Sequence, residues 1–129
     1  MPDRPAIILF AHGAREPEWA LPFERLRDRL RASGLRVEIA YLSSMRPPLE
    51  EAVATLARQG ATRVTIVPMF LAQGGHLKED LPRMVADIRS MHPTTELAIT
   101  PALGEAPEML DAMAAWVLRA AGEKGEAGR

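Results

Sequence analysis

The chain has 129 residues, of which 47% are hydrophobic and 26% charged, with a formal net charge of −1 and no cysteine. These values predict one globular domain, exclude disulfides and thiolate metal sites, and show no basic stripe of the kind that binds nucleic acid. The apolar runs are shorter than the ~20 residues of a membrane span, so we expect a cytoplasmic protein without a membrane contact. We expect one domain over residues 1–121 and a flexible tail over 122–129.

The first half of the chain alternates between strand and helix patterns. Residues 6–11 form an unbroken apolar run, which predicts a strand buried on both faces. A helix follows that ends at Ser33-Gly34 and whose apolar face is Trp19, Phe23, Leu26 and Leu30. Residues 37–42 predict a second strand. Pro47-Pro48 then opens a helix that Gly60 ends.

The second half repeats this alternation. Residues 64–67 predict a third strand, open to extension past Pro68 to Leu71. The next helix has Pro82 near its start and Asp80 as its cap, with an apolar face of Leu81, Met84, Val85 and Ile88. Residues 97–99 predict a short fourth strand. The last helical face consists of Leu110, Met113, Ala114, Val117 and Leu118.

Four strand–helix units in series predict an α/β fold, a three-layer sandwich around a four-stranded, mostly parallel sheet with flavodoxin-like topology. Sheets of this kind bind their ligands outside the carboxyl ends of the strands, near a switch in strand order. The loops after the first three strands are therefore where we expect a functional site.

Two of the three histidines lie in these loops. His12 follows the first strand and His76 follows the third, each beside glycine: Gly13, Gly74 and Gly75. The third histidine, His92, precedes Pro93 at a helix end, where capping or plain exposure explains it. One loop histidine is more often an ordinary surface side chain, so it is the pair that indicates function. Neutral imidazole binds iron, cobalt, nickel and zinc, and a site with few protein ligands keeps open coordination positions.

The two loops carry longer motifs. Residues 12–19, His-Gly-Ala-Arg-Glu-Pro-Glu-Trp, resemble the HGSRDP-type opening of the class II chelatases that act on sirohydrochlorin. Residues 68–82 resemble their second motif, P-x-F-L-x-x-G-x-H-x-x-x-D-I/L-P, and the resemblance extends to Val117. It implies a chelatase-like fold and insertion of a divalent metal into a sirohydrochlorin-type tetrapyrrole, in cobalamin or sirohaem biosynthesis. Co²⁺ is favoured, Fe²⁺ and Ni²⁺ stay open, and no organic cofactor is expected.

The resemblance also implies roles for individual residues. The family's metal-binding and catalytic histidines correspond to His12 and His76, and we expect substrate contacts from Gly13, Arg15, Ser43, Gly74 and Gly75. Ser43 stands where the family often has an acidic residue, which puts a carboxylate ligand in doubt. Glu79 and Asp80 are possible substitutes, although a helix cap is the better expectation for Asp80. Further candidates near the loops are the cations Arg46, Lys78 and Arg83 and an apolar wall of Met45, Met69 and Phe70.

Because larger chelatases of this class contain the unit twice, the resemblance implies a homodimer. The main alternative function is a carrier that binds metal or tetrapyrrole without turnover, which the serine at position 43 keeps open. A histidine phosphatase is disfavoured because Ala11 stands where that chemistry needs an arginine before the histidine. No Walker loop or G-x-G-x-x-G follows a strand, so a nucleotide cofactor is not supported.

Overall fold

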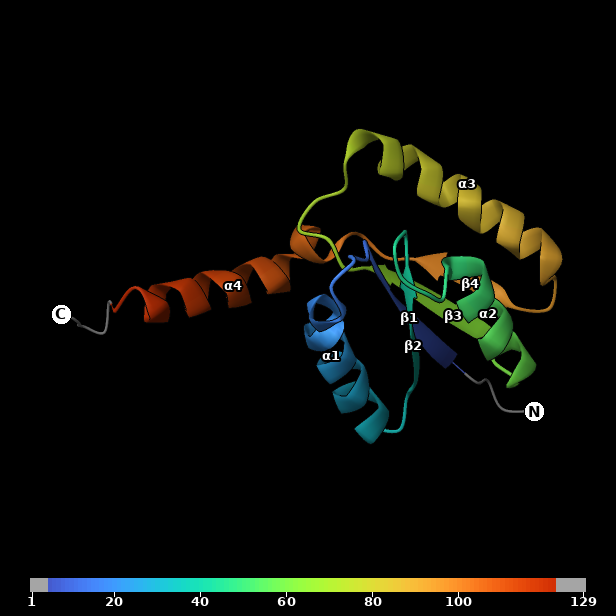
Figure 1. Cartoon of the computed structure of the whole chain (residues 1–129), viewed down its shortest axis with the longest axis horizontal. Coiled ribbons are helices and arrows are strands. Elements are labelled where there is room, and N and C mark those ends of the chain that lie inside the picture. Colours follow the sequence, from blue (N-terminus) through green and yellow to red (C-terminus); the bar gives the residue numbers. More distant parts are fainter. Residues whose placement is uncertain (1–4, 123–129) are drawn as a thin grey trace.

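A computed structural model describes residues 5–122 (Figure 1). Its strands are β1 (Pro5–Ala11), β2 (Arg36–Tyr41), β3 (Arg63–Pro68) and β4 (Glu96–Ile99). Its helices are α1 (Leu21–Ala32), α2 (Leu49–Arg58), α3 (Gly75–Met91) and α4 (Pro107–Ala120), with short 3-10 helices η1 (Pro17–Ala20) and η2 (Leu103–Glu105). The strands form one sheet in the order β2-β1-β3-β4, with every pair parallel. The predicted α/β class and strand count are confirmed.

The sheet has a separate apolar cluster on each face, because successive side chains of a strand point to opposite sides. On one face, Ile8 and Phe10 of β1 pack with the buried sides of α2 and α3. On the other, Leu9 of β1 and Ile39 of β2 pack with α1 and η1. Figure 1 shows α1 on one side of the sheet and α3 on the other. These layers hold the strands rigidly, so the loops at the carboxyl edge start from fixed points.

The start of α3 and the end of β3 differ from the predictions. The helix begins at Gly75 and includes Pro82, so Asp80 lies within it and does not cap it. The first part of the helix contains the polar run Lys78-Glu79-Asp80, so apolar periodicity does not predict it. No side chain caps its amino end. Strand β3 ends at Pro68, which has no N–H to continue the ladder, so the extension to Leu71 is wrong.

The other helix boundaries agree with the sequence signals to within a few residues. Gly34 and Gly60, which follow α1 and α2, have φ of +94° and +92°, as expected for glycines just past a helix end. Pro48 is the N-cap of α2, so the helix itself begins one residue later, at Leu49. The predicted last helix is present as α4, but it does not cover the sheet. It extends away from the other elements (Figure 1), and none of its residues is buried.

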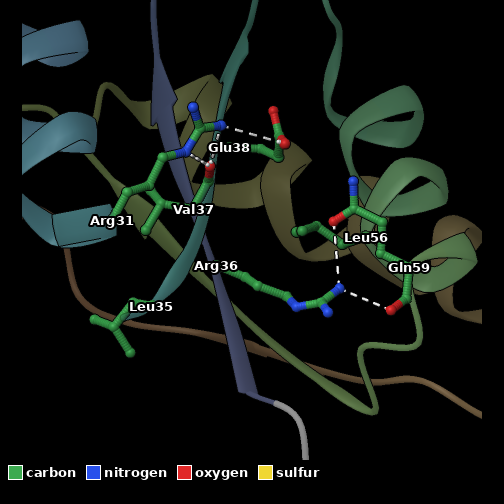
Figure 2. A pocket seen from close by; sticks show the side chains of 7 residues that line it. All are labelled: Arg31, Leu35, Arg36, Val37, Glu38, Leu56 and Gln59. Atoms are coloured by element: carbon green, nitrogen blue, oxygen red, sulfur yellow. Dashed lines mark hydrogen bonds and ion pairs between the residues drawn. The ribbon is translucent and has the colours of Figure 1, made fainter. Parts of the chain in front are cut away.

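A cavity of about 280 Å³ lies at the amino edge of the sheet, opposite the edge expected to hold a site (Figure 2). Its charged groups are used within the fold. Arg31 of α1 donates two hydrogen bonds to the carbonyl oxygen of Val37, at 2.7 and 3.0 Å, and Arg36 donates to the carbonyl oxygen of Gln59 at 2.7 Å. Because β2 is an edge strand, the bonds from Arg31 satisfy a backbone carbonyl at the side of the sheet, and the bond from Arg36 satisfies a carbonyl at the end of α2. We assign this cavity a structural role.

The sequence analysis predicted a flexible tail over residues 122–129 and no membrane contact. The predicted tail falls, apart from Gly122, on residues 123–129, which lie outside the described part. Across residues 5–122, no helix combines the length and apolar character needed to cross a membrane.

Candidate functional site

The loops after β1, β2 and β3 leave the sheet at the same edge because the three strands are parallel neighbours. Backbone hydrogen bonds hold the beginnings of these loops together. Met69 N–H donates to the carbonyl oxygen of Phe10 at 2.8 Å, and Leu42 N–H donates to that of Ala11 at 2.9 Å. The first residues of these loops are therefore held rigidly. From this edge the chain after β1 continues to one face of the sheet, and the chain after β3 continues to the other.

His12 is the first residue after β1, and its side chain is exposed. Its ring lies against the ring of Phe70, with the centroids 4.4 Å apart and the planes inclined by 46°. Phe70 is itself buried and packs edge-on against Phe10, with centroids 6.0 Å apart. One side of the imidazole is thus supported by an apolar ring fixed to the core, while the residue stays open to solvent. Phe70 was expected as part of an apolar wall for the macrocycle; in the structure it is buried and belongs to the core cluster on the α2 and α3 side of the sheet.

Gly13 lets the loops after β1 and β2 come into contact. Its φ is +90°, and a Cβ atom added to it would lie 1.8 Å from the carbonyl oxygen of Ser43. The two loops are also joined by a hydrogen bond of 3.0 Å from Ser43 N–H to the carbonyl oxygen of His12. Ser43 is exposed and adjoins the backbone of His12. The structure thus brings together three of the predicted residues: His12, Gly13 and Ser43.

His76 is the second residue of α3 and is exposed. The chain between β3 and α3 rises from the sheet before the helix begins (Figure 1). The glycines before His76, Gly74 and Gly75, have φ values outside the positive region. Apart from the chain neighbours and the nearby backbone of α3 itself, no described heavy atom lies within 4 Å of a Cβ built on either one. Their role is therefore not to relieve crowding within the chain, and the space beside the backbone here is open to a ligand.

A third acidic ligand is not part of this arrangement. Within residues 5–122, no group of three or more His, Asp or Glu side chains is placed to share a metal ion. Glu79 and Asp80 are exposed on α3, and Asp80 lies 3.7 Å from Arg83, as an ion pair on the helix surface.

The cations expected near the site are distributed unevenly. Arg15 and Arg46 line a cavity of about 300 Å³ at the carboxyl edge, together with Pro17, Ala20, Glu24, Tyr41 and Met45. Arg46 also pairs with Glu51 at 2.7 Å. Lys78 and Arg83 lie on the exposed surface of α3. Met69 packs into the cluster on the α1 side of the sheet and belongs to the core.

The sequence interpretation did not single out the two titratable residues Tyr41 and Glu24 of this cavity. Tyr41 is the last residue of β2, and burial raises its pKa, with a further rise from Glu24 and an opposing effect from Arg27. Its place at a strand end was a usable signal, because side chains there face the same edge as the histidine loops. Glu24 gave no such signal, since it is one of many charged residues on α1.

Comparisons with known proteins agree with this fold. A family model described as CbiX matches residues 6–120. A sirohydrochlorin cobaltochelatase of Saccharolobus solfataricus is 31% identical over 104 residues, which are 76% of this chain and 81% of that protein. A protein of the same name from Methanopyrus kandleri is 33% identical over 62% of this chain, but the match covers only 57% of its own length.

Solved structures of chelatase-type proteins have the same fold as this chain. The fold of a cobalamin (vitamin B12) biosynthesis CbiX protein from Marinobacter aquaeolei VT8 matches with a TM-score of 0.80 and 32% identity, over 91% of this chain and 97% of that one. The sirohydrochlorin chelatase SirB from Bacillus subtilis, in complex with cobalt, shares the fold with a TM-score of 0.74 at 24% identity. That match covers 90% of this chain and 50% of the SirB chain. On the family match and the identity to these relatives, the chain belongs to the CbiX family of chelatases.

Proposed function

We propose that this protein inserts a divalent metal, with Co²⁺ as the first candidate, into a sirohydrochlorin-type tetrapyrrole. The observation that carries the proposal is the placement of two exposed histidines on loops after neighbouring strands, in a chain of the CbiX family. Cobalt is favoured because relatives carry the name sirohydrochlorin cobaltochelatase. Fe²⁺ and Ni²⁺ remain candidates, since imidazole binds all three ions. The absence of cysteine is compatible with the cytoplasm, where we propose the reaction takes place.

The reaction exchanges one M²⁺ ion for two protons. The metal binds the four ring nitrogens, and two pyrrole N–H groups lose their protons. A protein can assist by presenting a partly dehydrated ion to one face of the ring and by accepting the protons. Imidazole suits both tasks, because its neutral nitrogen binds metal and it acts as a base near neutral pH. We assign both tasks to His12 and His76. With two protein ligands, the ion is held weakly enough to be handed over.

The surroundings of His12 support the binding of a flat, acidic macrocycle. Phe70 fixes one side of the imidazole, and Gly13 and Ser43 keep the loop close to the sheet. Arg15 and Arg46 line the cavity at the same edge, where they are available to carboxylate groups of the substrate. We further propose that Gly74 and Gly75 leave room for the macrocycle beside α3, since their surroundings are open.

We also propose that the working form is a homodimer. This chain matches about half of the SirB chain, which is the relation expected if two copies of the unit make up the longer protein. Homo-oligomers with a two-fold axis are the commonest assemblies of soluble chains. A dimer would supply a second copy of each histidine loop.

The test is an anaerobic absorbance assay with sirohydrochlorin and Co²⁺, Fe²⁺ or Ni²⁺ in separate reactions. The wild-type protein is expected to raise the insertion rate above the spontaneous rate. His12→Ala and His76→Ala are each expected to lower the rate by about 100-fold or more, as loss of a proton acceptor does. His92→Ala is the matched control, because His92 caps the far end of α3 and should keep the wild-type rate. Equal rates in all four proteins would refute the assignment of the site.

A carrier without turnover is the second candidate, and Ser43 is the observation that favours it. No described carboxylate replaces the acidic group that the family resemblance leads one to expect there. A carrier would shift the absorbance of sirohydrochlorin on binding, or bind Co²⁺, without accelerating insertion. Saturable binding with an insertion rate equal to the spontaneous rate would decide for the carrier.

A further inference from the structure

The hydroxyl group of Tyr41 has no hydrogen-bond partner among residues 5–122, although the residue is only 7% exposed. Tyr41 lines the cavity of about 300 Å³ at the carboxyl edge of the sheet. Buried hydroxyl groups in folded proteins nearly always have a partner, so an unpaired one needs an explanation. Burial raises the pKa of Tyr41, with a further rise from Glu24, so the hydroxyl keeps its proton at neutral pH. A buried hydrogen-bond donor is therefore available to a ligand in this cavity.

The charged side chains of the cavity favour a ligand with one negative charge. Arg15 and Arg46 outnumber Glu24, so the lining has one net positive charge. Arg46 already pairs with Glu51 at 2.7 Å. The guanidinium of Arg15 makes no hydrogen bond or ion pair with any residue in the described part of the chain. Arg15 is therefore the cation that can pair fully with an incoming anion.

The size and the remaining walls of the cavity narrow the chemistry of the ligand. The other lining residues are apolar, and they suit methylene groups next to a charged end: Pro17, Ala20 and Met45. A volume of about 300 Å³ is at the lower limit of small-molecule sites, so the cavity takes a short group and not a whole macrocycle. A phosphate group carries close to two charges at neutral pH, which this lining does not balance. A carboxylate on a short alkyl chain matches both the charge and the walls.

The cavity and the ring of His12 lie against different layers of the fold. Tyr41 pairs in register with Ala11, and both belong to the cluster on the α1 side of the sheet. Phe70, against which the His12 ring lies, belongs to the cluster on the α2 and α3 side. Arg15 nevertheless follows His12 closely in the same loop. The cavity is therefore separate from the histidine and is joined to it by a short piece of chain.

We propose that this cavity is a carboxylate-binding site, in which the Tyr41 hydroxyl donates a hydrogen bond to the carboxylate and Arg15 pairs with the same group. The carboxylate has two sources to distinguish, a free small carboxylic acid and a carboxylate arm of the macrocycle. The second source rests on the proposed function, and it would hold the tetrapyrrole from the α1 side. The first source needs no tetrapyrrole, so the site can be tested without the insertion reaction.

The first test titrates sodium acetate into the full chain at constant ionic strength, set with sodium chloride. Two-dimensional amide NMR follows the backbone signals of Arg15 and Met45, and the same spectra report whether each variant is folded. We expect a saturable shift with a dissociation constant in the millimolar range, because a group of this size makes few contacts.

Variants of the lining give the direction of each contribution. Arg15→Gln and Tyr41→Phe are each expected to weaken acetate binding by about tenfold, because each removes a hydrogen bond to a charged group. Glu24→Gln should strengthen it by about threefold, since a like charge leaves the lining. Arg29→Gln is the matched control: it removes one positive charge from the exposed surface of α1 outside the cavity, and it should bind acetate as the wild type does.

The second test identifies the source with metal-free sirohydrochlorin and no metal ion, so that no insertion takes place. If the cavity takes an arm of the macrocycle, sirohydrochlorin displaces acetate, and Arg15→Gln and Tyr41→Phe weaken sirohydrochlorin binding, measured by absorbance, by about tenfold. If it takes a free acid, acetate binds equally with and without sirohydrochlorin, and both variants keep the wild-type affinity for the macrocycle. Either result supports the carboxylate site.

The proposal is overturned if neither ligand binds in a way that depends on Arg15 and Tyr41. A dependence on Arg15 alone would also overturn it, because the unpaired hydroxyl would then have another role. Metal insertion by the wild type, measured separately, would in both cases leave the proposed function intact.

Discussion

Three glycines differ in the reason for which the fold needs a residue without a side chain, so replacing each one by alanine gives a comparison with its own controls. Gly34 has a φ of +94° with no described neighbour within 4 Å of an added Cβ. Gly104 has no positive φ, but its Cβ would lie 1.8 Å from the carbonyl oxygen of Leu71. Gly13 combines both conditions, with φ of +90° and a Cβ that would lie 1.8 Å from the carbonyl oxygen of Ser43. Replacing each by alanine separates backbone strain from steric contact.

The magnitudes follow from these geometries. Gly34→Ala introduces only the positive-φ strain, which costs about 1–2 kcal/mol. Gly104→Ala forces two backbone segments apart, and we expect a loss of about 1–3 kcal/mol, as for overpacked sites. Gly13→Ala carries both penalties and should lose about 2–5 kcal/mol, because the two terms act on the same residue. The loops after β1 and β2 then separate, so this variant should also lose most of the insertion activity.

Urea unfolding, followed by circular dichroism, gives the free energies, and thermal unfolding provides a check at about 4 °C per kcal/mol for a chain of this size. In order of decreasing stability we expect the wild type, Gly34→Ala, Gly104→Ala and Gly13→Ala. If Gly13→Ala and Gly34→Ala unfold at the same urea concentration, the contact between the loops after β1 and β2 is wrong.

Three further predictions concern the core, the alkaline limit and the site. Leu56→Ala removes a side chain that is 1% exposed and should cost about 2–5 kcal/mol, whereas Leu71→Ala, at 69% exposed, should cost less than about 0.5 kcal/mol in urea unfolding. Burial raises the pKa of Tyr41 above its ordinary value of 10.0, so its contribution to stability is complete below that pH and is lost as pH rises toward the higher folded value. The urea midpoint should therefore fall above pH 10.0, and Tyr41→Phe should remove part of this fall; since Tyr41 is the one tyrosine of the sequence, tyrosinate absorbance reports its titration directly. Ser43→Glu restores a carboxylate beside His12 and should tighten Co²⁺ binding by about tenfold in calorimetry, because carboxylate adds an anionic ligand; unchanged affinity would show that position 43 does not face the ion.

The strands and most helix boundaries were predictable because they depend on local signals. Buried parallel strands are continuous apolar runs, and glycines such as Gly34 and Gly60 mark helix ends by their conformation. The start of α3 was not predictable, since its first turn has neither a capping side chain nor an apolar stripe. The sequence predicted that His12 and His76 follow the first and third strands at the carboxyl edge of the sheet, and the structure has both residues there. It did not indicate the ring contact of His12 with Phe70. That contact arises because the loop after β3 places the side chain of Phe70 in the core, beneath His12.

The last helix shows a different limit. Its apolar spacing predicted a helix with a face to bury, and α4 is such a helix. Periodicity records that a face needs a partner but carries no information about which molecule supplies it. Among residues 5–122, the lack of a helix over Ala98 becomes visible only when strand register and exposure are combined.

The strand order has a consequence for how the site can change over evolutionary time. From β1 the chain runs into α1 on one face of the sheet, and from β3 it runs into α3 on the opposite face. A substitution that shifts the α3 layer is therefore expected to move His76 directly, and to affect His12 through the ring of Phe70, which lies in the same loop.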